Sequence, residues 1–164
     1  MRVLVAGVGN IFFGDDGFGP EVARRLTTGT AGLPEGVRVV DYGIRGMHLA
    51  YDLLDGYDAL VLVDTLPAEA EPGTITVLEV GASDLGAGEF DAHGMDPVSM
   101  LGSLSALGGE LPPTYVVGCS PADVEEGIGM TPQVRAAVDE GVRSVTELLT
   151  ERVMPMLAAT NVGS

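Results

Sequence analysis

The chain of 164 residues contains no lysine and no tryptophan, and it has a single cysteine, Cys119. Without lysine there is no Walker-type phosphate-binding lysine, no Schiff-base lysine and no lysine general base. One cysteine cannot form a disulfide within the chain, which fits a reducing compartment. The first residues also lack the charged, apolar and small-residue series of a signal peptide. We therefore expect a cytoplasmic protein.

Positive charge is scarce as well. Eight basic residues, all arginine, stand against 24 acidic residues, and the formal net charge is −16. Such a surface repels phosphate backbones and anionic membrane surfaces. The longest apolar runs are far shorter than the roughly 20 residues that a membrane span needs. We expect no nucleic-acid partner and no membrane span, whereas metal ions, cationic ligands and basic peptides remain compatible with the composition.

Apolar runs alternate with amphipathic patterns along the chain. The runs predict five buried strands, at 2–7, 37–42, 59–64, 74–80 and 114–119. Helical patterns begin at Pro20 and cover 46–56, 96–109 and 131–153. The third and fourth strands lack a helix between them, so the fourth is expected to run antiparallel. This order predicts a three-layer α/β/α sandwich with a mixed, mostly parallel five-stranded sheet.

The length and composition predict one domain. Hydrophobic residues make up 46% of the chain, which is enough apolar surface for one core. Pro155 interrupts the last helical pattern, because proline lacks the N–H that a helix interior requires. We therefore predict a single α/β domain over residues 1–154 and a flexible tail over 155–164.

Several reactive side chains follow the predicted strands at their carboxyl ends, where parallel α/β sheets bind ligands. The segment GNIFFGDDGFGP (9–20) places two adjacent acids in a glycine-rich turn after the first strand. The residues expected at this edge are Asp15, Asp16, Asp41, Asp64 and Cys119.

His93, in EFDAHGMDP, is expected to return to this edge through a long loop. Two carboxylates and one imidazole would suit a borderline divalent ion such as nickel or zinc, with positions left open for another ligand. The same groups could instead perform general acid and base chemistry. Residue types alone do not separate these two uses.

Five segments, in order, resemble one known family. They are GVGNIFFGDDGFGP, DYGIRGMHLAYDLL, LVLVDT, DAHGMDP and VEEGIGMTPQVRAAVDEGV, and together they span roughly residues 1–150. The chain resembles the hydrogenase maturation endopeptidases. The resemblance implies a cytoplasmic peptidase that removes the C-terminal extension of a nickel-iron hydrogenase large-subunit precursor. We expect the peptidase to be a monomer. Nickel would be supplied by that precursor as the recognition signal, and no organic cofactor is implied.

The family's metal-contacting trio maps onto Asp16, Asp64 and His93, with a direct catalytic role for the same residues left open. Many members have glutamate at the position of Asp16, so the side chain here is one methylene shorter and its carboxylate extends less far from the backbone. The family's segment after the second strand usually reads nearer to Asp-Gly-Gly-Thr, whereas this chain has DYGI (41–44). The resemblance implies substrate contacts in this segment, at Asp41 and Gly43, although the segment departs from the family pattern.

The residues give different support to three alternative functions. Cys119 could be a nucleophile only if His93 reached it, and a lone cysteine at a buried strand end is usually inert. A dinucleotide fingerprint would need glycine where Phe12 stands. A non-catalytic nickel-binding maturation chaperone would use the same trio and is the main alternative. His48, on an apolar helix face, is expected to be structural.

Overall fold

The computed structural model describes residues 2–28, 33–44, 46–66, 70–80 and 111–162. Its strands are β1 (Val3–Val8), β2 (Val37–Gly43), β3 (Ala59–Thr65), β4 (Ile75–Val80) and β5 (Thr114–Cys119). Its helices are α1 (Phe18–Thr28), α2 (Gly46–Leu53), α5 (Pro132–Leu148) and α6 (Met154–Val162), with a 3₁₀ turn η1 (Gly14–Gly17) and a π-helical turn η2 (Leu149–Val153). The helix predicted at 96–109 lies outside the described residues.

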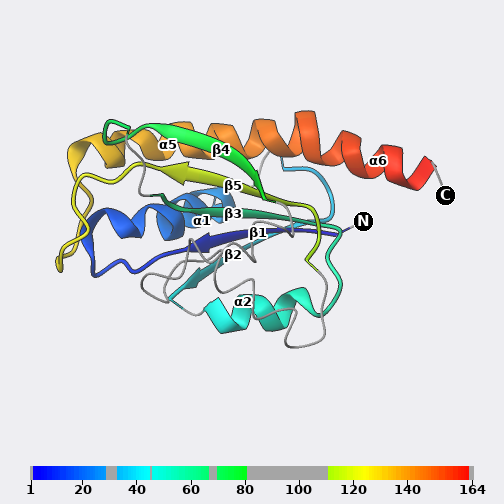
Figure 1. Ribbon diagram of the computed structural model, residues 1–164, viewed down its shortest axis with the longest axis horizontal. Helices are drawn as coiled ribbons and strands as arrows, with labels where there is room; N and C mark the ends of the chain where they lie inside the picture. The colour runs from blue at the N-terminus through cyan, green and yellow to red at the C-terminus, as the bar shows by residue number, and fades with distance from the viewer. Residues whose placement is uncertain (1, 29–32, 45, 67–69, 81–110, 163–164) are drawn as a thin grey trace.

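The five strands form one sheet in the order β2-β1-β3-β5-β4 (Figure 1). β1 pairs in parallel with β2 and β3, and β3 pairs in parallel with β5. β4 runs antiparallel to β5 at the sheet edge. The mixed, mostly parallel sheet and the antiparallel fourth strand are therefore confirmed. The short connection from β3 to β4 explains the reversal, because a parallel return requires a longer crossover.

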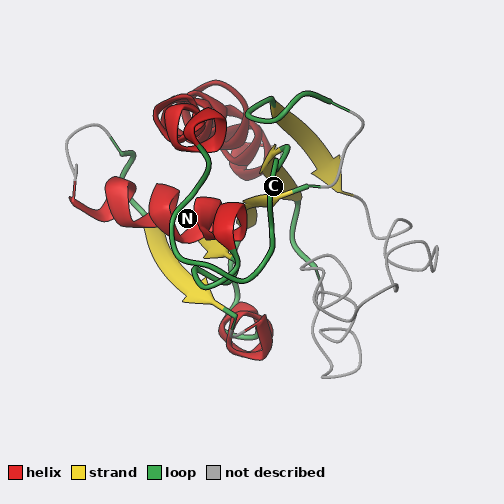
Figure 2. Ribbon diagram, turned by 90° about the vertical axis from the view of Figure 1, so that its left-hand side faces the viewer, coloured by secondary structure: helices red, strands yellow, loops and turns green. Residues whose placement is uncertain are grey.

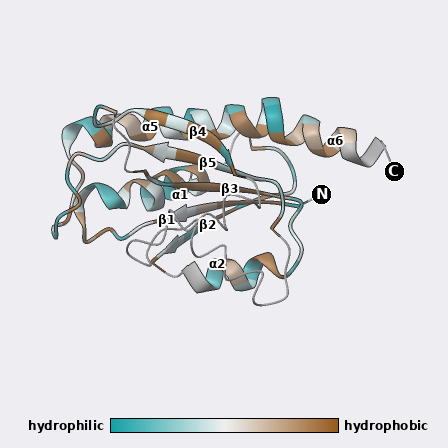
Figure 3. Cartoon of the chain, viewed as in Figure 1, coloured by the Kyte–Doolittle hydropathy of each residue, from teal (hydrophilic) through white to brown (hydrophobic). Residues whose placement is uncertain are grey.

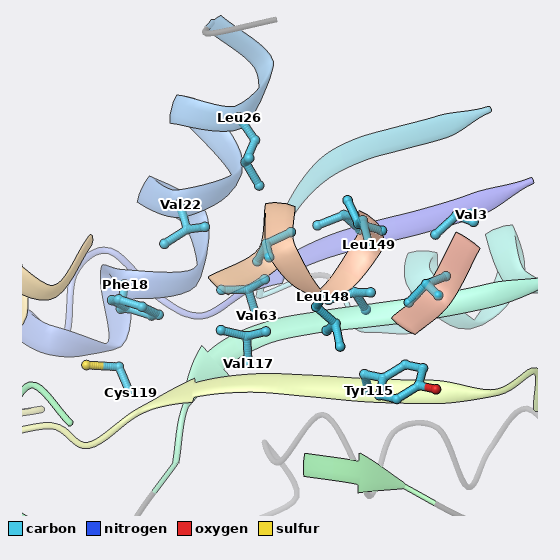
Figure 4. Close-up of a cluster of buried hydrophobic side chains, with 14 of the residues drawn as sticks. Val3, Phe18, Val22, Leu26, Val63, Tyr115, Val117, Cys119, Leu148 and Leu149 are labelled. Carbon is cyan, nitrogen blue, oxygen red and sulfur yellow. The ribbon is translucent and has the colours of Figure 1, made fainter. Parts of the chain in front are cut away.

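Helices cover both faces of this sheet (Figure 2). On one face, α1 and α5 share a buried cluster with β3 that includes Phe18, Val63 and Val138 (Figure 4 shows part of it). On the other face, α2 contributes Leu49 to a second cluster. β3 has hydrophobic colouring along much of its length, whereas the long C-terminal helix alternates in character (Figure 3). This is the predicted three-layer arrangement, since a strand buried on both faces is apolar throughout.

The start of α1 lies unusually close to the sheet. A Cβ atom on Gly19 would collide with the backbone carbonyl oxygens of Val8 and Val63. Glycine is therefore required where the helix crosses the ends of β1 and β3. This close approach places η1, which carries the two adjacent acids, directly at the carboxyl edge of the sheet.

The chain does not break its last helix at Pro155, and this part of the prediction was wrong. η2 joins α5 to α6, so that one long helix extends beyond the sheet in Figure 1. The N–H of Met154 donates to the carbonyl of Leu149, five residues back, as in a π-helix. This wider turn accommodates a residue that lacks an N–H. The domain limit at 154 and the flexibility of the tail stay predictions.

No helix within the described part of the chain combines the length and apolar character needed to cross a bilayer.

Candidate active site

The two adjacent acids of η1 have different environments. Asp15 is fully buried and accepts hydrogen bonds from the backbone N–H groups of Ala122, Asp123 and Thr131 at 2.8, 2.9 and 2.6 Å. The Thr131 hydroxyl also donates to this carboxylate. Burial raises the pKa of Asp15, but the hydrogen bonds from these three residues outweigh it and leave the pKa below its ordinary 3.8. Asp15 therefore fastens η1 to the segment before α5.

Asp16 instead lines a small pocket at the carboxyl edge of the sheet. Its Oδ2 accepts the backbone N–H of Asn10 at 2.8 Å, and its Oδ1 accepts the hydroxyl of Thr65 at 3.0 Å. Gly9, with φ of +147°, lets η1 close over the end of β1, because a Cβ there would collide with the carbonyl oxygen of Asp16. The backbone around β1 thus holds the Asp16 carboxylate in one direction.

Asp64, at the end of β3, lines the same pocket. Its side chain is only 5% exposed, and its Oδ1 accepts the backbone N–H of Thr65 at 2.7 Å. Thr65 therefore contacts both carboxylates, through its hydroxyl to Asp16 and through its amide to Asp64. Thr65 was not predicted as a site residue. The only feature of the sequence that pointed to it was its position immediately after Asp64.

The pocket itself has a cavity volume of about 40 Å³. That space accommodates a single ion or water molecule. It is lined by Val8, Gly9, Asn10, Asp16, Gly43, Ile44 and Asp64. Two acidic side chains that are 48 positions apart in the sequence, Asp16 and Asp64, thus line one small pocket.

These two carboxylates suit a divalent cation. Carboxylate oxygens bind such ions, and a carboxylate offers about four lone-pair directions. The hydrogen bonds from Asn10 and Thr65 occupy two of the lone-pair directions of the Asp16 carboxylate. Within the described ranges no group of three metal-binding side chains occurs. His93, the third predicted ligand, lies outside those ranges.

The two candidate substrate contacts have different positions. Gly43 lines the pocket, and its carbonyl accepts the N–H of Gly9 at 2.9 Å. Asp41 is exposed and is not among the residues that line the pocket. Its Oδ1 accepts the N–H of Gly43 at 2.9 Å, which turns the chain at the end of β2. Asp41 therefore shapes the turn that brings Gly43 to the pocket.

Cys119 lies in the same core cluster as Phe18 (Figure 4). Burial, together with the nearby charge of Asp15, raises the pKa of the Cys119 thiol to about 11. A buried thiol with such a pKa supplies very little thiolate, which is the nucleophilic form. Cys119 is therefore a packing residue, as the sequence favoured.

A larger hollow of about 340 Å³ lies beside β2 and α2. It is lined by Val40, Tyr42, His48, Tyr51 and Asp52. His48 is exposed there, so its assignment to an apolar structural face was wrong. Because this hollow contains one carboxylate rather than a convergent pair, the smaller pocket is the better candidate for chemistry.

Comparison with known proteins finds relatives of one kind. A family model described as hydrogenase maturation protease matches residues 20–148. The hydrogenase 2 maturation protease of Escherichia coli is 32% identical over 155 residues, covering 92% of this chain and 92% of that protein. The coenzyme F420 hydrogenase subunit delta of Methanothermobacter thermautotrophicus is 32% identical over 153 residues, covering 89% and 93%.

A solved structure shows the same fold. The hydrogenase maturating endopeptidase HybD from E. coli superposes with a TM-score of 0.76 at 29% identity, covering 92% of this chain and 93% of that chain. This α/β sandwich is thus the scaffold of a peptidase, a hydrolase of peptide bonds. The chain belongs to the hydrogenase maturation protease family.

Proposed function

We propose that this protein removes the C-terminal extension from the nickel-loaded precursor of a nickel-iron hydrogenase large subunit. Membership of the family supports a processing endopeptidase. In this proposal Asp16, Asp64 and His93 contact the nickel that the precursor carries, and the ion is part of the substrate. The protein would thereby cleave only precursors that have received their metal.

The observation that carries the proposal is the shared pocket of Asp16 and Asp64. Both carboxylates are oriented by Thr65, and Asp64 is almost entirely removed from solvent. Two carboxylates that line one small pocket can both bind a divalent cation. A metal ion that arrives with the substrate would be such a cation and would align the tail over the sheet edge.

Water is the proposed attacking group. Among the described residues, those that line the pocket include no serine, threonine or cysteine, and Cys119 is buried in the core. The water oxygen forms a bond to the scissile carbonyl carbon, the carbon–nitrogen bond breaks, and a proton passes to the leaving amine. A nearby nickel ion can polarise the carbonyl as a Lewis acid.

The test uses purified protein with nickel-loaded and nickel-free precursor, followed by mass spectrometry of the product. We expect removal of the extension from the loaded form only. Asp16→Asn and Asp64→Asn, checked for folding by circular dichroism, should each slow cleavage by about 100-fold or more.

Glu147→Gln is the matched control, because Glu147 is an exposed carboxylate on α5, remote from the pocket. It should cleave at the wild-type rate. Nickel-dependent binding of the precursor without any cleavage by the wild-type protein would instead support the chaperone alternative. Normal cleavage by both aspartate variants would remove the proposed role of the carboxylates.

A further inference from the structure

Two loops meet beside the pocket. Residues 10–13 follow β1, residues 121–129 precede α5, and together they are called the double loop here. The N–H of Gly127 donates to Phe12 O at 2.7 Å, and the N–H of Gly14 donates to Gly127 O at 2.8 Å. A parallel bridge also joins Phe13 to Gly127. Figure 1 shows the two loops side by side at one end of the sheet.

The double loop carries a concentration of exposed apolar side chains. Half of the large hydrophobic residues that are exposed in the described part of the chain lie on it, with exposed fractions between 41% and 82%. They are Ile11, Phe12, Phe13, Val124 and Ile128. Single exposed hydrophobic residues are ordinary, but a group of them marks an interaction site.

This apolar group borders the candidate active site. Asn10 lines the pocket, and its Oδ1 accepts the N–H of Phe12 at 2.9 Å. Ile44, which is 57% exposed, lines the pocket from the turn after β2. A polypeptide that carries a metal ion to the pocket would therefore continue onto apolar side chains.

Charge selects among the partners that could cover this surface. Asp123, Glu125 and Glu126 are exposed on the double loop, and segment 120–131 contains no basic residue. A second copy of this chain would bring like charges together, since the net charge is −16. Anionic lipid would be repelled for the same reason. The favoured partner is apolar at its centre and basic at its edges.

We propose that the double loop docks an apolar segment, flanked by basic residues, of the same precursor that the pocket processes. This inference rests on the proposed function and adds a second recognition surface to it. The pocket would sense the metal, and the double loop would hold the polypeptide. Docking is then expected to affect mainly KM, whereas the carboxylates affect kcat.

The double loop is held in place before any partner arrives. Asp15 binds the backbone of Ala122 and Asp123 from inside, and its own N–H donates to Asp123 O at 2.8 Å. A surface that is already ordered avoids part of the entropy cost of binding. Exposed aromatic and aliphatic side chains on such a surface are suited to act as anchors.

The test compares two double variants in cleavage kinetics on nickel-loaded precursor. Phe12→Ser with Ile128→Ser removes two anchors. Leu54→Ser with Val77→Ser removes two other exposed apolar side chains, on the α2 side and on β4. We expect the first variant to raise KM about tenfold, equivalent to about 1.4 kcal/mol, with kcat changed less than about twofold. The second should match the wild type.

A charge variant gives an independent readout. Glu125→Gln with Glu126→Gln should weaken precursor binding and should flatten its dependence on salt, since exposed charge pairs are screened by ions. Affinity is measured by surface plasmon resonance with immobilised precursor at two salt concentrations. Binding that keeps the wild-type salt dependence would contradict the charge argument.

The failures of the two proposals are distinguishable. If the wild type cleaves but the Phe12 and Ile128 variant keeps its KM, the docking inference is wrong and the proposed function stands. If the wild type does not cleave, the proposed function fails, and docking is then judged by precursor binding alone. Equal binding by the Phe12 and Ile128 variant and by the Leu54 and Val77 variant would overturn the docking inference as well. A wild-type dimer in sedimentation that the Phe12 and Ile128 variant dissociates would also overturn it.

Discussion

Replacement of Asp15 by asparagine tests whether Asp15 is the structural acid of the adjacent pair, with Asp16 as the functional one. An asparagine has one carbonyl oxygen where aspartate has two acceptors. In the more favourable of its two orientations, the asparagine oxygen keeps the hydrogen bonds from the N–H groups of Ala122 and Asp123. Its NH₂ group then faces the N–H of Thr131, which in the wild type donates to Asp15 at 2.6 Å. One buried donor then loses its partner.

The magnitude follows from these contacts. An orphaned buried N–H costs about 2 kcal/mol, and each of the two remaining bonds loses about 1 kcal/mol when its acceptor is neutral. Burial of a neutral amide is less costly than burial of a carboxylate, which offsets part of this loss. We expect Asp15→Asn to lower the free energy of unfolding by about 2–3 kcal/mol.

Urea unfolding followed by circular dichroism measures this change. With a slope of about 2 kcal/mol per molar, the midpoint should fall by about 1–1.5 M. Glu147→Gln, which removes an exposed carboxylate on α5, is the control and should keep the wild-type midpoint. An Asp15→Asn midpoint within about 0.25 M of the control would refute the structural role of this acid.

The effect should also depend on pH. The pKa of Asp15 is lower in the folded protein than its ordinary 3.8, so the stabilisation is complete above that value and is lost as pH falls through the folded pKa. The difference between wild type and Asp15→Asn should be constant from pH 7 to about pH 5 and should shrink below about pH 4. A constant difference down to pH 2 would contradict this linkage.

Three further results are expected. Thr65→Val should weaken Ni²⁺ binding, measured by calorimetry, about tenfold because it removes the hydroxyl that orients Asp16. Thr65→Ser keeps a hydroxyl and should keep the wild-type affinity. Equal Ni²⁺ affinities of the valine variant and the wild type would contradict the positioning role. Cys119, with its pKa raised to about 11 by burial, should resist iodoacetamide at pH 8 until urea unfolds the protein, and rapid labelling of the native protein would show an accessible thiol. Gly19→Ala should lower the unfolding free energy by about 2 kcal/mol or more, because its Cβ meets two backbone carbonyls that cannot rotate away, and an unchanged urea midpoint would contradict this packing.

The positions of the strands were predictable because their signal is local, but the prediction that all five are buried was wrong for the edge strands β2 and β4, which are partly exposed. The run 59–64 is apolar at every position before Asp64, and observed β3 differs from that prediction only at its final residue. The missing crossover also determined the direction of β4. The helix boundaries were less predictable: α1 begins at Phe18 rather than Pro20, because η1 supplies an earlier turn. Pro155 misled the prediction because the π-helical turn before it cannot be inferred from residue type.

The site was predictable only in part. The convergence of Asp16 and Asp64 follows from the rule that parallel strands end at one edge. The separation of Asp15 from Asp16 depends on Ala122 and Thr131, which are more than 100 residues away in the sequence. No sequence motif marks Thr65 as a site residue. Contacts between distant segments, rather than local pattern, decide which of two adjacent identical acids is buried.

Anomalous diffraction at the nickel absorption edge tests the central claim most directly. Crystals of the protein soaked with Ni²⁺ should show a peak between the carboxylates of Asp16 and Asp64, with oxygen atoms about 2 Å from the ion. The peak should be lost in crystals of Asp16→Asn. A nickel peak elsewhere on the molecule, with this pocket empty, would contradict the account.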